Sequence, residues 1–326
     1  AQNMVFALFF FLLIVEIPIE GLSLPPPAHL KQLLQAAQEN HSALAMPCVY
    51  DGISARLVAN QFPITFLSGF SVAAARGYPD RGILSLQELT ESARQVTEAL
   101  ARATSSGPPI PLIADGDTGF DGSSAMSLRR TIFSYGAANC AAVMIEDQVF
   151  PKRCGHVAGK DVINFESAVK RVKIACAARD EYESKFGAGT GPLILARTDS
   201  NAIHGLEDAI SRCKAFVTAG ADITFLEAPK SLQELQQFCD SVPGPKLANM
   251  LEGGATPILS REQLGKIGVT LVAYPLSILG ASILGASKIL DVIKADGDIS
   301  SPAMDFNKMK NTVGFQEMDE YENKFN

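Results

Sequence analysis

The sequence predicts an α/β protein whose fold is a (β/α)8 TIM barrel followed by a C-terminal helical extension. Eight short apolar segments of β type recur along the chain, each with enough residues before the next for a helix. The segments end in polar residues, which is where the active site lies in such barrels. An open doubly wound sheet is disfavoured because Asp51-Gly52-Ile53-Ser54, after the first segment, is not a Gly-rich phosphate-binding turn.

The predicted elements alternate in the order that a barrel requires. Strands are expected at 43–49, 64–67, 110–114, 142–145, 193–196, 223–226, 246–250 and 271–273. The clearest helices between them are expected at 85–104, 165–186, 205–219, 231–241 and 260–267. A Gly- and Ala-rich segment at 277–295 predicts a closely packing helix, and 304–325 predicts a polar helical tail that covers the barrel or reaches a neighbouring subunit. We therefore expect one barrel domain over 28–326, with C-terminal helices from about residue 277.

The first 27 residues are expected to lie outside the barrel. Residues 4–15 form an unbroken apolar run, long enough for a signal-peptide core but short of the roughly 20 residues that a membrane-spanning helix needs. No Lys or Arg precedes the run, and Ile19-Glu20-Gly21-Leu22 is a poor cleavage site. The run is either a targeting segment or anchor, or a translated leader, and Pro25-Pro26-Pro27 is predicted to be a linker.

Composition restricts the partners and the compartment. Hydrophobic residues make up 47% of the chain and charged residues 19%, as in a well-buried globular protein. A net charge of -7 without basic runs argues against nucleic acid as a partner. A membrane partner is expected only if the N-terminal apolar run is kept as an anchor. Six cysteines without metal-binding spacing favour free thiols in a reducing compartment, either the cytoplasm or the interior of an organelle.

Three carboxylates follow two neighbouring predicted strands. Asp115 and Asp117 come at the end of the third strand, and Glu146 closes the fourth. Carboxylates that converge repel one another unless a cation lies between them, and oxygen ligands suit Mg²⁺ or Mn²⁺. Asp-Gly-Asp by itself is also common turn chemistry. Glu146 at the adjacent strand end favours the metal site.

Other strand ends carry groups that recognise anions. Arg197 ends the fifth strand, where it can clamp a substrate carboxylate in bidentate geometry or form an ion pair with Asp199. Ser68 and Gly69 follow the second strand and offer a hydroxyl and an open backbone N–H to the same anion. These residues predict a small-molecule carboxylate as the substrate.

The segment Lys152-Arg153-Cys154-Gly155-His156 combines a thiol, two cations and an imidazole within five residues. It follows the acidic Ile145-Glu146-Asp147-Gln148 after the fourth strand. A thiol flanked by positive charge acts as a nucleophile or moves a proton. Cys154 is therefore the candidate catalytic thiol.

This segment, together with 115–119, 145–148, 196–199 and 249–254, resembles the isocitrate lyase and phosphoenolpyruvate mutase superfamily from roughly residue 33 to the C-terminus. Within it, the chain is most similar to the short members: methylisocitrate lyases, dimethylmalate lyases, the petal death protein and oxaloacetate hydrolases. Members usually form tetramers that exchange a C-terminal helix, so the resemblance implies a helix-swapped homotetramer.

The resemblance also implies roles for the matching residues. The Mg²⁺ ligands, direct or through water, would be Asp115, Asp117 and Glu146, with Asp80 nearby. The substrate-binding residues would be Ser68, Gly69, Phe70, Gly155, Arg197, Glu227 and Asn249. The catalytic loop residues would be Lys152, Arg153, Cys154 and His156, with Cys154 as the proton donor.

The reaction that the resemblance implies is Mg²⁺-dependent retro-aldol cleavage of a 2-hydroxy di- or tricarboxylate, such as 2-methylisocitrate or a 2-alkylmalate. The products would be an α-keto acid and a carboxylate, with Cys154 protonating the enolate. The main alternative is hydrolysis of oxaloacetate to oxalate and acetate. A phosphonomutase is less favoured because mutases typically lack the loop cysteine, and a non-catalytic scaffold barrel is disfavoured by the intact residue set.

Two positions depart from the pattern of the lyases. Phe66 lies where such lyases often carry Tyr, so the base for the substrate hydroxyl is unassigned, with Tyr50 as a substitute. Phe70 follows Ser68-Gly69 where some relatives have Gly, which reshapes the pocket.

Overall fold

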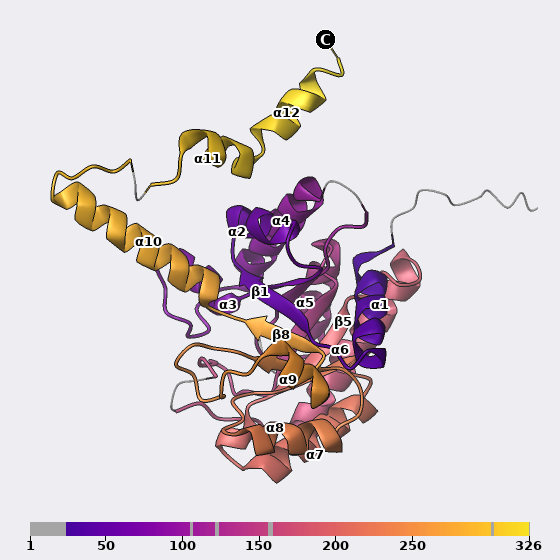
Figure 1. Ribbon diagram of the computed structural model, residues 1–326. Coiled ribbons are helices and arrows are strands. Elements are labelled where there is room, and N and C mark those ends of the chain that lie inside the picture. Colours follow the sequence, from indigo (N-terminus) through magenta and orange to yellow (C-terminus); the bar gives the residue numbers. More distant parts are fainter. Residues whose placement is uncertain (1–23, 105–106, 121–123, 156–158, 301–302, 326) are drawn as a thin grey trace, which may run out of the picture.

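The computed structural model describes residues 24–104, 107–120, 124–155, 159–300 and 303–325. Within these residues, eight parallel strands form a closed barrel in chain order, and β8 returns to pair with β1 (Figure 1). The strands are β1 (Leu44–Val49), β2 (Thr65–Leu67), β3 (Leu112–Asp115), β4 (Ala142–Glu146), β5 (Leu193–Thr198), β6 (Ile223–Leu226), β7 (Lys246–Asn249) and β8 (Leu271–Tyr274). The predicted barrel is confirmed, and no strand end differs from the prediction by more than two residues.

Helices surround the barrel and connect its strands. In chain order the elements that accompany the strands are α1 (Pro26–Glu39), α2 (Gly52–Ala59), α3 (Gly69–Ala75), α4 (Leu86–Ala103), α5 (Ala125–Ala137), α6 (Phe165–Phe186), the 3-10 turn η1 (Ser200–Ala202), α7 (Leu206–Thr218), α8 (Leu232–Ser241) and α9 (Arg261–Lys266). A side chain caps the N-terminus of six of them, namely α2, α3, α4, α6, α8 and α9. The Ser85 hydroxyl accepts from the Glu88 N–H, and the Glu88 carboxylate accepts from the Ser85 N–H, which fixes where α4 begins.

The barrel interior is filled by apolar side chains from all eight strands of the described barrel, among them Met46, Ile113 and Leu271. Leu30 and Leu34 of α1 pack into the same cluster. Burying a Leu side chain contributes about 1.5–3 kcal/mol. Because α1 immediately precedes β1, it closes the amino end of the barrel and leaves the carboxyl end free for a site.

Helix α1 corrects the prediction for the proline run. The helix begins at Pro26, so Pro26 and Pro27 form its first turn and only Pro25 lies before it. Proline is favoured at this position because its fixed φ suits the helix and its missing N–H would have no partner there. The prediction of a linker through residue 27 was therefore wrong for the last two prolines.

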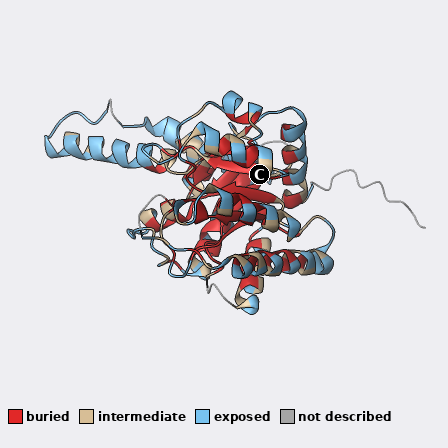
Figure 2. Ribbon diagram, turned by 90° about the horizontal axis from the view of Figure 1, so that it is seen from below, coloured by how far each residue is buried: buried red, intermediate tan, exposed pale blue. Residues whose placement is uncertain are grey.

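The C-terminal helices leave the barrel. Helix α10 (Ser277–Lys294) projects from the body of the molecule, and most of its surface is exposed (Figures 1 and 2). The predicted tail helix is divided into α11 (Phe306–Val313) and α12 (Phe315–Glu322) by Gly314, whose φ of 90° is left-handed. Arg56 of α2 holds this tail, since its Nε donates to the Thr312 carbonyl at 2.7 Å and its guanidinium pairs with Glu317.

No helix in the described part of the chain combines the length and the apolar character that crossing a membrane requires. The N-terminal apolar run at 4–15 lies outside the described residues.

Candidate active site

A cavity opens at the carboxyl ends of the strands, where the sequence predicts the site. Eleven predicted site residues line it: Ser68, Phe70, Asp80, Asp115, Lys152, Arg153, Cys154, Gly155, Arg197, Glu227 and Asn249. Three further predicted residues, Gly69, Asp117 and Glu146, lie immediately beside it, as their contacts below show. His156 lies outside the described residues.

The carboxylates at the ends of β3 and β4 are buried. Asp117 is 6% exposed and Glu146 is 2% exposed. Burial is the largest cause that raises the pKa of Asp117, to about 6, and it raises the pKa of Glu146 well above the usual range. Gly69 lies against Asp115 so closely that a Cβ atom would be 2.7 Å from Asp115 Oδ2. Little space therefore surrounds Asp115, and burial disfavours the negative charge that Asp117 and Glu146 would carry.

Lys152 offsets part of this charge. Its Nζ lies 2.6 Å from Asp80 Oδ1 and 2.8 Å from Asp117 Oδ1. Burial alone would lower the pKa of Lys152, but the surrounding carboxylates, Asp117 foremost, raise it well above its usual range. The ammonium therefore stays charged between two of the predicted metal ligands.

The carboxylate group fits Mg²⁺ in its chemistry. The donors are anionic oxygen atoms, and Glu146 Oε1 is buried without a hydrogen-bond partner among the described residues. As the described side chains stand, however, no three Asp, Glu, His or Cys groups surround one point at which they could hold a metal ion. The sequence predicted carboxylates that converge on a metal ion. In the described structure Lys152 instead lies between Asp80 and Asp117, a contact that the sequence did not reveal.

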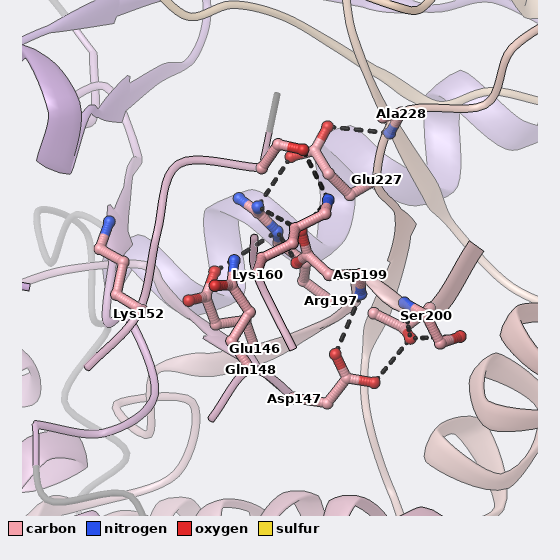
Figure 3. Close-up of polar contacts among 12 residues, drawn as sticks. Glu146, Asp147, Gln148, Lys152, Lys160, Arg197, Asp199, Ser200, Glu227 and Ala228 are labelled. Carbon is pink, nitrogen blue, oxygen red and sulfur yellow. Dashed lines mark hydrogen bonds and ion pairs between the residues drawn. The ribbon is translucent and has the colours of Figure 1, made fainter. Parts of the chain in front are cut away.

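Arg197 is the centre of a second buried group of charges (Figure 3). Its Nε donates to Asp199 Oδ2 at 2.8 Å, and its Nη2 lies 3.1 Å from Asp199 Oδ1 and 3.0 Å from Glu227 Oε2. Glu146 Oε2 is 3.5 Å from the Nε. Burial alone would lower the pKa of Arg197, but Asp199 and Glu227 raise it well above its usual range. The ion pair with Asp199 that the sequence left as an alternative is present, and Arg197 faces the cavity as well.

A hydrogen-bond network fixes Asp199 from behind. Asp147 Oδ1 accepts from the Asp199 N–H at 3.0 Å, and its Oδ2 accepts from the Thr198 hydroxyl at 2.6 Å (Figure 3). Arg212 donates to the same Oδ2 at 3.1 Å. Buried polar networks that are satisfied in this way hold their members in one arrangement.

The Cys154 segment is held against these charges. Gln148 brackets the preceding residue, because its Nε2 donates to the Arg153 carbonyl and its Oε1 accepts from the Arg153 N–H, both at 2.9 Å. On the other side, a Cβ atom on Gly155 would lie 2.3 Å from Arg197 Nη2 and 2.7 Å from Glu227 Cγ. Cys154 itself is half-buried and lines the cavity.

Lys160 is a site residue that the sequence reasoning missed. Its Nζ donates to Asp199 Oδ1 at 2.7 Å and to the Gly155 carbonyl at 2.5 Å (Figure 3). Gln148 was noticed only as part of an acidic motif. Nothing in the residue types marks either one as a site residue; the signal in the sequence was their position beside the cysteine segment.

Part of the cavity lining is apolar and comes from strands all around the barrel, and the sequence reasoning also missed most of it. Apart from Phe66 and Phe70, the apolar lining residues are Cys48, Met144, Phe225, Leu247, Leu251, Ala273, Pro275 and Leu276. Most of them resemble ordinary barrel core residues in the sequence. The cavity therefore combines charged groups with apolar surface that suits alkyl groups.

Tyr50, the substitute suggested for the missing tyrosine, is not among the residues that line the cavity. Its hydroxyl donates to Ser282 Oγ of α10 at 3.0 Å. The structure thus gives it a role in holding α10.

Comparison with known proteins gives the relatives of this chain. It is 36% identical to the petal death protein of Dianthus caryophyllus over 293 residues, which cover 88% of this chain and 86% of the relative. It is 37% identical to a 2-methylisocitrate lyase of Salmonella typhimurium over 267 residues, covering 82% and 81%.

Solved structures agree with these relatives. A crystal structure of 2,3-dimethylmalate lyase matches with a TM-score of 0.80 and 31% identity, covering 91% of this chain and 95% of that one. A structure of oxaloacetate acetylhydrolase with 3,3-difluorooxalacetate matches with a TM-score of 0.82 and 27% identity, covering 92% and 97%.

The family model for phosphoenolpyruvate phosphomutase matches residues 33–293, which span all eight strands of the described barrel. The barrel, the charged cavity at its carboxyl end and the relatives agree. The chain is an enzyme of the phosphoenolpyruvate mutase and isocitrate lyase superfamily, related to its carbon–carbon lyases.

Proposed function

We propose that this protein is a Mg²⁺-dependent lyase that cleaves a carbon–carbon bond in a 2-hydroxy di- or tricarboxylate of the 2-methylisocitrate or 2-alkylmalate type. The observation that carries the proposal is that Cys154, Arg197 and Asp115 line one cavity. A thiol, an anion-binding guanidinium and a carboxylate group are the parts that such a cleavage needs. The lyases among the relatives support the same class of reaction.

The charged residues that line the cavity bind the polar groups of the substrate. Arg197, with the Ser68 hydroxyl, binds the carboxylate of the part that becomes the α-keto acid. Asp115, Asp117 and Glu146 would hold Mg²⁺, with Asp80 nearby, and the ion would supply polarisation of the substrate's hydroxyl and carboxylate oxygens. The apolar residues that line the cavity accept an alkyl substituent of the substrate.

Proton transfers complete the reaction. Bond cleavage leaves a carbanion stabilised by the adjacent carboxylate, and Cys154 donates a proton to its carbon. Lys152 and Arg153 line the cavity beside Cys154 and stabilise the negative charge of this carboxylate. With Phe66 in place of a tyrosine and Asp115 assigned to Mg²⁺, the lining carboxylate that accepts the substrate hydroxyl proton would be Glu227.

A second candidate is hydrolysis of oxaloacetate to oxalate and acetate. Phe66 favours it, since the phenol of the lyases is missing, and the solved oxaloacetate acetylhydrolase superposes well on this chain. The same arginine and cysteine would bind a dicarboxylate and protonate the leaving carbanion.

A substrate panel tests both candidates. The purified protein with Mg²⁺ is offered 2-methylisocitrate, 2,3-dimethylmalate and oxaloacetate, and α-keto acid release is followed with lactate dehydrogenase while oxalate and acetate are measured chromatographically. We expect α-keto acid from one of the hydroxy acids. Oxalate from oxaloacetate alone would establish the hydrolase instead, and no product from any of the three would refute both.

We also propose that α10 is exchanged between subunits of a homotetramer. Leu279 is the one buried residue of α10, all of which is described, while Ile283, Leu284, Leu290 and Ile293 are more than half exposed (Figure 2). An apolar surface of this kind is usually covered in solution. Light scattering coupled to gel filtration should give four times the chain mass, and a monomer would contradict the proposal.

We infer a reducing compartment, the cytoplasm or the interior of an organelle. All six cysteines lie in the described part of the chain, and none of them forms a disulfide there. Fluorescent fusions of the full chain at its C-terminus test this, and accumulation in the secretory pathway would refute it.

A further inference from the structure

Lys160 links two neighbouring parts of the site through hydrogen bonds. Its side chain is 5% exposed, and Asp199, which it contacts at 2.7 Å, is fully buried. The same ammonium binds the Gly155 carbonyl at 2.5 Å. One cation thus connects the backbone next to Cys154 with the carboxylate that orients Arg197.

The charges around Arg197 need this cation. Arg197 lies within 3.5 Å of three carboxylates, those of Asp199, Glu227 and Glu146. Asp199 and Glu227, which contact Arg197 at 3.1 Å or less, bring two negative charges against one positive charge, so without a second cation the group would repel the carboxylate of a substrate. Lys160 is the second cation that contacts the group at Asp199.

The position of Asp199 makes the effect of Lys160 direct. The carboxylate uses Oδ2 for Arg197 Nε, and shares Oδ1 between Arg197 Nη2 and Lys160 Nζ. If the ammonium is lost, Arg197 is the one cation of these two that still pairs with Asp199. The guanidinium would then be drawn to Asp199 and away from the cavity.

The contact with Gly155 adds a geometric role. Gly155 packs against Arg197 so tightly that even a methyl group would not fit. The hydrogen bond from Lys160 fixes the carbonyl of this residue, and Cys154 is its chain neighbour. The thiol is therefore placed from two sides, by Gln148 at Arg153 and by Lys160 at Gly155.

We propose that Lys160 is a positioning residue that sets the affinity of Arg197 for the substrate carboxylate and holds Cys154 against the cavity through one ammonium group. The identity of the anion in this inference rests on the proposed function. The contacts of Lys160 with Asp199 and Gly155 do not depend on it. Lys160 does not contact the reacting atoms in this role; it acts through Asp199 and Gly155.

Two measurements on Lys160→Met, Lys160→Arg and the matched control Lys173→Met test the proposal. Lys173 is an exposed lysine of α6. Hydrogen–deuterium exchange in peptides that cover 149–163 measures how firmly the cysteine segment is held. Calorimetry with oxalate at saturating Mg²⁺ measures the affinity of the Arg197 group for an anion, and a Mg²⁺ titration alone measures the metal affinity.

In Lys160→Met we expect faster exchange in 149–163 and a loss of oxalate affinity of about tenfold or more, since hydrogen bonds to charged groups are lost. Mg²⁺ affinity should stay unchanged, Lys160→Arg should recover most of the oxalate affinity, and Lys173→Met should behave as the natural chain. If Lys160→Met does not fold, Lys160→Gln replaces it. The charge rescue by Arg separates positioning from a merely structural role.

The results distinguish this inference from the proposed function. Unchanged oxalate affinity in the Lys160 variant, or no rescue by Arg, would overturn the inference while the natural chain still binds oxalate and turns over substrate. If the natural chain does not bind oxalate, the proposed function fails. In that case the exchange data alone decide, and unchanged exchange in Lys160→Met overturns the inference.

Discussion

Adding one methyl group at Gly155 should separate substrate affinity from folding. In Gly155→Ala the new Cβ would lie 2.3 Å from Arg197 Nη2 and 2.7 Å from Glu227 Cγ. Both distances are too short for non-bonded atoms, so either the arginine or the cysteine segment must move. Arg197 lies within β5, one residue before its end, and is held by Asp199, so we expect the segment that carries Gly155 to move.

Overpacking of this kind typically costs about 1–3 kcal/mol. At 1.36 kcal/mol for each factor of ten, this corresponds to a loss of about 5- to 150-fold in the arrangement that places Cys154 against the cavity. The cost falls on the position of the loop that carries Cys154 rather than on the barrel core. The melting temperature should therefore stay close to that of the natural chain while turnover and oxalate affinity fall together.

The assays are steady-state turnover of the substrate found in the panel, oxalate calorimetry with Mg²⁺, and differential scanning calorimetry. Gly52→Ala serves as the matched control, because a Cβ atom there meets Ala99 at an ordinary 3.7 Å. Turnover and oxalate affinity in Gly155→Ala within threefold of the control would refute the reasoning. That result would mean that the close packing of Gly155 on Arg197 is not the working arrangement of the site.

Three other predictions concern the thiols and the C-terminal helices. Cys154→Ser should lower turnover by orders of magnitude in stopped assays while calorimetry finds Mg²⁺ affinity unchanged; retained turnover would remove the thiol from the mechanism. Burial raises the pKa of Cys176 and Cys239 to about 12, whereas unfolded thiols titrate near about 8.5. The unfolded chain therefore loses protons first as pH rises, and the melting temperature should fall steadily between about pH 9 and pH 12; a flat profile by calorimetry would contradict this. Arg56→Ala removes the bond to the Thr312 carbonyl and should speed proteolysis within α11 and α12, so a cleavage rate equal to that of the natural chain would show that other contacts hold the tail.

The fold was predictable because each strand combines a short apolar run with a polar end. Helix α6 was predicted at its observed ends, since Asn164 caps its start and Gly187 follows its last residue. The proline run was misread, because proline breaks a helix in the interior but favours its first turn. The break at Gly314 was missed because a single glycine inside a polar helical pattern does not by itself reveal a left-handed φ.

The candidate site was predictable at residues whose side-chain chemistry and position at a strand end indicate a functional role. Asp115, Arg197 and Cys154 are of this kind, and all three line the cavity. Lys152 was predicted as a catalytic residue, but its contacts with Asp80 and Asp117 were not, and Lys160 was not predicted, because a lysine in a sequence gives no sign of whether it is solvated or enclosed among carboxylates. Only the packing of β3, β5 and the cysteine segment around one another decides that.

The closure of the barrel between β1 and β8 also determines when the site can exist. Leu44 pairs with Leu271 only after the last strand has formed, and Arg197 and Asn249 take their places on strands that depend on that closure. Contacts between residues so far apart in sequence form slowly, because closing a long loop lowers the conformational entropy of the chain before the contact stabilises it. A nascent chain on the ribosome therefore has no substrate pocket until nearly all of it has emerged, and ligands can stabilise this protein only at the end of its folding.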